Sequence, residues 1–223
     1  MRILCISDIH GHADALIDVL AFGKSQGCTV TLAAGDHCFS GPRPLDTWKL
    51  LTGVNAHCTQ GIGDWAITSV DPDDIPVSCP HEEARVQRLR EVQQELGEDI
   101  LEQIARLPKT FHMSLEDGGE LMLVHGSPMD PTTSITHDMT DDEVRMLLGD
   151  ADIDVLVCGG AHVPFERILD STHIVAVGSV GESPTVGFAQ AAILDTSNAG
   201  VSVRLIQLDL RGSDSTKQST SNP

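Results

Sequence analysis

Asp8 and His10 stand two residues apart, directly after a short apolar run, and their side chains suit a divalent metal ion. The run, Arg2 to Ile6, is apolar and β-branched enough to predict a buried strand. Side chains alternate along a strand, so Asp8 and His10 are expected on the same side beyond its end. A carboxylate oxygen beside an imidazole nitrogen favours Mn, Fe or Zn. Taken alone, the pattern also fits a strand-end turn with a capping aspartate.

The same arrangement recurs after three more predicted strands. Each is a short apolar run that leads into an aspartate or histidine next to a glycine. Ligands of α/β proteins collect beyond the carboxyl ends of the strands, so four such ends together predict a metal-centred site. The three further runs, with the residues that they deliver, are Thr29 to Ala34 with Asp36, Glu120 to Val124 with His125, and Ile153 to Cys158 with His162.

The segments between and after these strands predict an α/β protein. Apolar residues at helical spacing from His12 to Gln26 connect the first two strands, and such a unit favours parallel strands with a right-handed crossover. The chain from Arg167 to Leu208 is β-rich, with turn signals at Asp170-Ser171 and Asn198-Ala199-Gly200. These strands predict the antiparallel second half of a sandwich.

The strand-end motifs resemble those of the calcineurin-like metallophosphoesterases, in the order in which that family has them. Within the family, the YfcE-like phosphodiesterase branch is the most similar. The resemblance extends from about Met1 to about Leu208, and it implies a four-layer αββα sandwich of two mixed β-sheets flanked by helices. The segments that carry it are Asp8-x-His10, Gly35-Asp36 with Gly41-Pro42, Val124-His125-Gly126-Ser127-Pro128, Gly159-x-x-His162-Val163-Pro164 and Gly178-Ser179-Val180-Gly181.

The resemblance also implies a set of metal ligands. Asp36 corresponds to the carboxylate that bridges the two metal ions of the family. Mn is the expected ion, with Fe, Zn and Ni as alternatives, because histidine ligands disfavour the harder Mg. The implied ligands are Asp8, His10, Asp36, His125 and His162.

Two positions depart from the family's pattern, and both affect the same metal of the pair. Ile62 stands where the family's Gly-Asn-x-Asp motif has a metal-binding asparagine, and Gly160 stands where its Gly-His-x-His motif has the first histidine. The other metal keeps all its implied ligands, whereas this one retains Asp36 and His125. We therefore expect one or two ions per chain. Asp64 is a tentative replacement ligand, or it holds its loop by hydrogen bonds.

Two residues next to the motifs are candidates for catalysis or for contact with a substrate phosphate. His12 follows the first motif, where it can contact a phosphate or donate a proton, or simply belong to the first turn of a helix. Arg43 follows a Gly-Pro turn, where its guanidinium can clamp a phosphate or remain solvated at the start of a helix.

The domain organisation is expected to be simple. A chain of 223 residues suits one domain, here residues 1–210. Residues 66–107 form an insertion with two helical stretches, His81 to Leu96 and Glu98 to Leu107. This insertion is a candidate substrate cap or dimer contact, with simple surface packing as the alternative. Residues 211–223 are polar without apolar periodicity, so the sequence predicts a disordered tail.

The amino-acid composition excludes some classes of binding partner. A formal net charge of −19 repels phosphate backbones and anionic membranes, so non-specific nucleic-acid binding is not expected. The sequence has no run of eighteen apolar residues, and its six cysteines form no CxxC pair. We expect a cytoplasmic protein that acts on a small phosphorylated substrate and is a candidate for homo-oligomerisation.

These features predict a metal-dependent phosphoesterase that hydrolyses a phosphodiester or phosphomonoester through a metal-activated water. The alternative is a catalytically weakened family member that acts as a metal-binding or protein-interaction module. Ile62 and Gly160 favour the alternative, whereas retention of the other implied ligands favours catalysis. Nucleotides, cyclic nucleotides, phosphomonoesters and phosphoproteins all fit as substrates.

Overall fold

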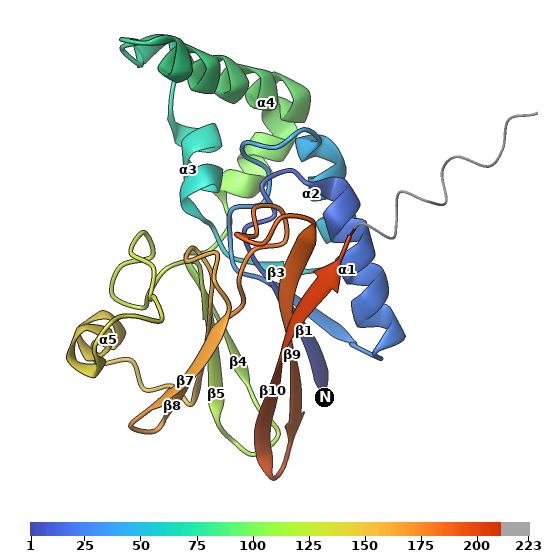
Figure 1. Ribbon diagram of the computed structural model, residues 1–223, viewed down its shortest axis with the longest axis vertical. Helices are drawn as coiled ribbons and strands as arrows, with labels where there is room; N and C mark the ends of the chain where they lie inside the picture. Colours follow the sequence, from blue (N-terminus) through green and yellow to red (C-terminus); the bar gives the residue numbers. More distant parts are fainter. Residues whose placement is uncertain (211–223) are drawn as a thin grey trace, which may run out of the picture.

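Two mixed β-sheets form the centre of the protein in the computed structural model, which describes residues 1–210 (Figure 1). The first sheet contains β1 (Arg2–Ile6), β2 (Val30–Ala33), β3 (His57–Cys58), β9 (Phe188–Ser197) and β10 (Gly200–Asp209), in the order β10-β9-β1-β2-β3. The second sheet contains β4 (Thr110–Ser114), β5 (Glu120–Val124), β6 (Val155–Cys158), β7 (Phe165–Leu169) and β8 (Thr172–Ala176), in the order β4-β5-β6-β8-β7. The segment predicted to be a disordered tail lies outside the described residues.

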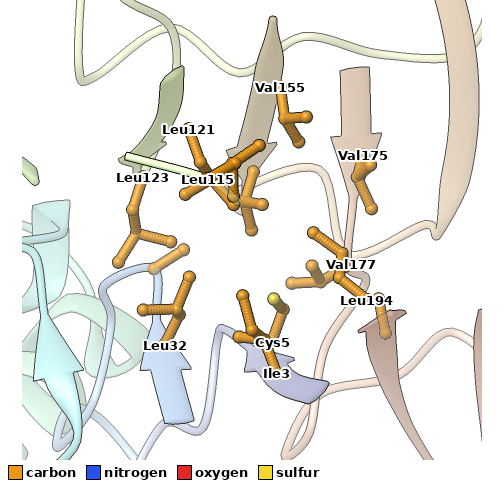
Figure 2. Packing of buried hydrophobic residues seen from close by; sticks show 13 residues of the cluster. Ile3, Cys5, Leu32, Leu115, Leu121, Leu123, Val155, Val175, Val177 and Leu194 are labelled. Carbon is orange, nitrogen blue, oxygen red and sulfur yellow. The ribbon is translucent and has the colours of Figure 1, made fainter. Parts of the chain in front are cut away.

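Alternation along the strands builds the core between the two sheets (Figure 2). Ile3 and Cys5 of β1 face inward, together with Leu32 of β2, and meet Leu121 and Leu123 of β5. All five side chains are fully buried. Burial of a leucine-sized side chain contributes about 1.5–3 kcal/mol, so this layer holds the sheets together.

Helices cover the outer faces of both sheets. The intervening residues of β1, Leu4 and Ile6, pack against α1 (Ala13–Ser25) and α2 (Pro44–Gly53). The outer face of the second sheet packs against α5 (Asp141–Leu148). These layers confirm the prediction of an α/β fold with two mixed β-sheets flanked by helices.

The C-terminal strands differ from the expectation that they build one antiparallel half. β7 and β8 join the second sheet, where β8 is parallel to β6. β9 and β10 return to the first sheet, where β9 is antiparallel to β1. The prediction was wrong because apolar alternation indicates a strand but not the sheet edge that it joins.

The insertion lies at one end of the sheets, above the ends of the strands in Figure 1. It contains the second half of α3 (Ile62–Ser69), a short 3-10 helix (Pro72–Asp74) and α4 (Pro80–Ala105). Gly97 has a φ of 73° and interrupts α4 between the two helical stretches that the sequence predicts. A small core of its own fixes the insertion on α2, through Cys38, Trp48, Ile67, Leu89, Val92, Leu96 and Ile104. No helix within residues 1–210 has the length and apolarity to cross a membrane.

Candidate metal centre

Four of the predicted ligands share an unusual backbone conformation at the strand ends. Asp8, His10, Asp36 and His162 have φ angles of 53°, 50°, 53° and 56°. Only six non-glycine residues within 1–210 have positive φ, and each such residue costs on the order of 1–3 kcal/mol. The N–H groups of Asp8 and His10 donate to the carbonyls of Gly35 and Asp36, over 3.1 and 2.9 Å, which locks the β1 and β2 loops together. Strain concentrated in this way is typical of functional sites.

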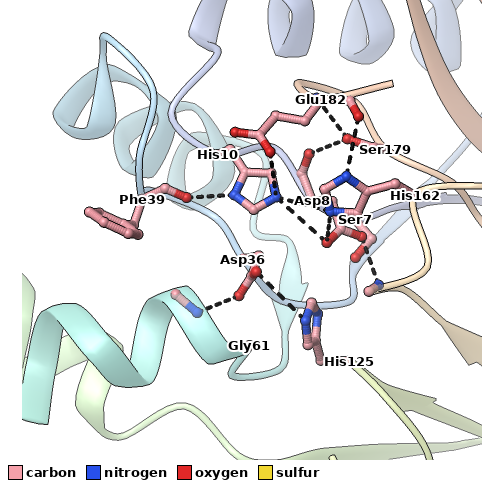
Figure 3. Close-up of polar contacts among 12 residues, drawn as sticks. Ser7, Asp8, His10, Asp36, Phe39, Gly61, His125, His162, Ser179 and Glu182 are labelled. Carbon is pink, nitrogen blue, oxygen red and sulfur yellow. Dashed lines mark hydrogen bonds and ion pairs between the residues drawn. The ribbon is translucent and has the colours of Figure 1, made fainter. Parts of the chain in front are cut away.

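Asp8, His10 and His162 form one group of converging donor atoms (Figure 3). Oδ1 of Asp8 lies 3.1 Å from Nε2 of His162 and 3.7 Å from Nε2 of His10, and the two Nε2 atoms are 3.3 Å apart. Oδ2 of Asp8 accepts from the N–H of Gly160 over 2.9 Å, whereas the buried Oδ1 has no hydrogen-bond partner within residues 1–210. A cation among these atoms would satisfy that oxygen.

Backbone carbonyls orient the imidazole rings. Nδ1 of His10 lies 2.5 Å from the Phe39 carbonyl, and Nδ1 of His162 lies 3.2 Å from the Glu182 carbonyl. We assign the ring proton to Nδ1 in both, since a carbonyl can only accept. Each Nε2 then presents a lone pair to the centre, as metal-binding histidines usually do.

Asp36 and His125 form a second group together with Asp8. Oδ2 of Asp36 lies 3.7 Å from Nε2 of His125, while its Oδ1 accepts from the N–H of Gly63 over 2.7 Å. Nδ1 of His125 is fixed by the carbonyl of Ala34 at 2.8 Å. Asp8 is therefore the carboxylate common to both groups, whereas the resemblance implied Asp36 as the bridge.

The two departures from the family motif lie on the side of this second group. Ile62 is 45% exposed and provides no donor atom. A Cβ atom at Gly160 would lie 3.4 Å from Nε2 of His125 and would collide with the hydroxyl of Ser134. A side chain at position 160 would thus face the second group, and Ser134 occupies the space where it would begin.

Asp64 lies outside both groups and supports the loop beneath them. It is fully buried, and its two oxygens accept from the N–H groups of His37 and Gly61 over 3.0 and 2.9 Å. His37 in turn lies 3.0 Å from the Thr59 carbonyl through its Nε2. Asp64 therefore holds its loop by hydrogen bonds, which was the alternative to its prediction as a metal ligand.

The carboxylates and imidazoles of the site shift one another's pKa values. Burial by itself would raise the pKa of Asp8, but the contact with His162 and the charge of His125 together lower it. The same contact raises the pKa of His162. Burial raises the pKa of Asp36. Burial by itself would lower the pKa of His125, but the negative charges of Asp36 and Asp8 have the larger effect, so the pKa of His125 is raised. Buried carboxylates thus rely on neighbouring positive charge, which a bound cation would supply.

His12 and Arg43 differ in how free they are to meet a substrate. His12 precedes α1 and is half-buried against Gly181, and burial lowers its pKa. Arg43 donates from Nη1 to Asp14 over 2.6 Å and from Nε to Asp46 over 2.8 Å. Contact between Arg43 and a phosphate would therefore compete with two carboxylates, while His12 has no such ion pair.

Glu182 is a site residue that the sequence reasoning missed. Its Oε2 lies 3.7 Å from Nε2 of His10, and its own carbonyl orients His162. The hydroxyl of Ser179 accepts from the Glu182 N–H and donates to the Asp8 carbonyl, over 2.7 and 2.8 Å. The available signal was the place of Glu182 directly after the Gly178-Ser179-Val180-Gly181 turn.

Arg88 of α4 binds the loop that orients His10. It donates from Nε to the carbonyl of Ser40 over 3.0 Å and from Nη2 to the carbonyl of Gly41. We expect Arg88→Ala to weaken Mn binding by about 10-fold, because partners that orient ligands typically contribute 10–100-fold. Isothermal titration with Mn measures this directly.

The matched control is Arg90→Ala on the same helix, since Arg90 binds the surface carboxylate of Asp73 over 2.6 Å. It should bind Mn like the unmodified chain. Equal Mn affinities for Arg88→Ala and the unmodified chain would show that the loop keeps its geometry without this contact.

A four-layer sandwich with carboxylates and imidazoles at four strand ends defines the metallophosphoesterase class of fold. The chain belongs to the calcineurin-like phosphoesterase superfamily, whose domain model matches residues 1–199. None of the curated proteins compared with the chain matches it in sequence.

Solved structures show the same fold at low sequence identity. A metallophosphoesterase from Sphaerobacter thermophilus superimposes with a TM-score of 0.76 at 22% identity, covering 96% of this chain and 90% of the other. A hypothetical protein from Pyrococcus horikoshii gives a TM-score of 0.79 at 19% identity, covering 93% and 88%. The phosphoesterase YfcE from E. coli gives 0.52 at 19%, covering 95% and 100%.

Proposed function

We propose that this chain is a metal-dependent phosphoesterase that hydrolyses a small phosphodiester or phosphomonoester. The observation that carries the proposal is the buried Oδ1 of Asp8, which faces the Nε2 atoms of His10 and His162 and has no hydrogen-bond partner among the described residues. Membership of the phosphoesterase superfamily supplies the reaction type in general. The six cysteines, all within the described residues, are unpaired, which supports a cytoplasmic location.

The donor set fits a divalent transition metal. Asp8, His10 and His162 would hold one ion firmly, and Asp36 with His125 would hold a second more weakly. Two imidazoles and a carboxylate favour Mn, with Fe, Zn and Ni as alternatives. When bound, such an ion polarises a phosphoryl oxygen and lowers the pKa of a bound water toward about 7.

The chain's own groups hold the reacting centre in place. The carbonyls of Phe39 and Glu182 fix the imidazoles before a substrate arrives, so little reorganisation accompanies the reaction. Nδ1 of His125 donates to the Ala34 carbonyl, so when no second ion is bound the protonated imidazole can donate from Nε2, beside Asp36, to a phosphoryl oxygen. His12 is our candidate for proton transfer to the leaving group, since it is half-buried next to the Gly181 turn.

A second function, metal binding without turnover, is favoured by one observation. Ile62 offers no donor atom, and Ser134 stands where a side chain at Gly160 would begin, so the second group lacks two ligand positions of the family. A single ion still acidifies water, but it cannot clamp both the attacking and the leaving oxygen. The two functions differ in whether the metal-loaded chain hydrolyses phosphate esters.

Loading the chain with Mn should raise its melting temperature by roughly 5–10 °C. At a Mn concentration 100 times the dissociation constant, binding stabilises the fold by about 2.7 kcal/mol, and 1 kcal/mol corresponds to about 2–4 °C at this size. Thermal denaturation with and without Mn measures the shift, and hydrolysis of bis(p-nitrophenyl) phosphate and p-nitrophenyl phosphate is followed in the same samples.

Stabilisation with turnover supports the phosphoesterase. Stabilisation without turnover of either ester supports the metal-binding module instead. Absence of any shift with Mn, Fe, Zn or Ni would contradict the metal centre itself.

A further inference from the structure

A pocket of about 270 Å³ lies next to the metal centre, on the side where the family's ligands are missing. Pockets for a whole drug-sized ligand measure roughly 300–1,000 Å³, so this one suits a single ring system of a larger substrate. The residues that matter for its chemistry are Gly61, Ile62, Trp65, Lys109 and Thr132.

The two walls of the pocket continue the loops that carry metal-site residues. One wall starts at Gly61, and a Cβ atom there would collide with Oδ1 of Asp36. Gly61 therefore both lines the pocket and lies against that carboxylate. The other wall, Asp130 to Thr132, belongs to the loop that follows His125, where Ser127 accepts from and donates to Asp130. A substrate whose phosphate binds at the metal centre can therefore place its organic group in this pocket.

The lining is unusual for this molecule. Trp65 is 52% exposed, although the chain has only two tryptophans and no tyrosine, and the other tryptophan, Trp48, is buried in the insertion's core. Ile62 lies exposed beside Trp65 in the same pocket. Lys109 adds a positive charge in a chain with 14 basic and 33 acidic residues. An exposed indole in a pocket that also contains the side chains of Lys109 and Asp130 suits a planar ring that carries polar atoms.

We propose that this pocket binds the base of a nucleotide substrate whose phosphate ester is hydrolysed at the metal centre. The base stacks on Trp65 and contacts Ile62, while Lys109 meets an exocyclic oxygen of the base. Ile62 thus serves as a wall of the pocket at the position where the family has a metal ligand. This inference rests on the proposed phosphoesterase function and names its substrate class.

The test compares two diesters with the same leaving group, the p-nitrophenyl ester of thymidine 5′-phosphate and methyl p-nitrophenyl phosphate. In both, a water oxygen bonds to phosphorus, the bond from phosphorus to the p-nitrophenol oxygen breaks, and the water protons pass to solvent. Trp65→Ala should lower kcat/KM for the thymidine ester by about 5- to 150-fold, mainly through KM, because stacking contributes that much. The methyl ester should be unaffected.

Two further variants sharpen this result. Trp65→Phe keeps an aromatic face and should recover most of the loss, while Lys109→Gln should raise KM for the thymidine ester alone. An equal effect of Trp65→Ala on both esters, or no effect on either, would overturn the proposal.

Binding supplies a readout that does not depend on turnover. Thymidine 5′-phosphate should quench the fluorescence of the Mn-loaded chain, and it should not quench Trp65→Phe, which retains only the buried Trp48. Inorganic phosphate, which lacks a base, should leave the fluorescence unchanged. Quenching without hydrolysis of any ester would support nucleotide binding in the pocket and contradict the proposed phosphoesterase activity. Hydrolysis without quenching would contradict nucleotide binding in the pocket and support the proposed phosphoesterase activity.

Discussion

Replacing Asp8 with asparagine is expected to abolish firm Mn binding and to slow ester hydrolysis by roughly 100- to 10,000-fold. The asparagine can still accept the Gly160 N–H, but it removes the negative charge that faces His10 and His162. Loss of a metal that contributes several kcal/mol to transition-state stabilisation corresponds to this range. Mn titration and kcat/KM for bis(p-nitrophenyl) phosphate measure both effects.

Asp152→Asn is the matched control for this substitution. Asp152 is exposed and precedes β6, at the end of the sheet opposite the metal centre, so its loss of charge should change neither quantity. If the Asp8→Asn protein bound Mn and hydrolysed the ester like the control, Asp8 would not be a ligand of the metal centre.

Truncating Leu123 to alanine is expected to cost about 2–5 kcal/mol of unfolding free energy. Leu123 of β5 is fully buried between the two sheets, and a leucine-to-alanine change there loses burial and leaves a cavity. For a chain of this size, that loss lowers the melting temperature by roughly 5–15 °C. Urea denaturation and calorimetry of the metal-free protein measure it.

Leu205→Ala on β10 is the control, since Leu205 is 39% exposed. Its cost should stay within about 0.5 kcal/mol, as is usual for surface positions. If the two variants unfolded at the same denaturant concentration, the layer between the sheets would not be the main stabilising core.

The residues that converge on the metal centre could be found from the sequence because each one directly follows an apolar run. β1, β2, β5 and β6 are nearly the predicted strands, and parallel pairing aligns the carboxyl ends of β1 with β2 in one sheet and of β5 with β6 in the other. Hydrophobic periodicity also predicted α1 and the break of α4 at Gly97. These features depend on local chemistry, which the sequence carries directly.

Contacts between distant segments could not be predicted. Glu182 lies beside His10 in a turn that is held by long-range contacts, among them the hydrogen bond from Ser179 to the Asp8 carbonyl across 171 residues. Arg88 resembled a solvated residue, since nothing local indicates that its guanidinium meets the Ser40 carbonyl. Asp64 was expected in a loop, yet it lies in the first turn of α3, where it accepts from the Gly61 N–H and caps the helix.

The most direct test of the metal centre is the Mn content of three proteins after loading and gel filtration, measured by elemental analysis. We expect about one ion per chain for the unmodified protein and for His125→Ala, and almost none for His162→Ala. This result would place the firmly held ion among Asp8, His10 and His162. A His162→Ala protein that retains its ion, or an unmodified protein that retains none, would contradict the central claim.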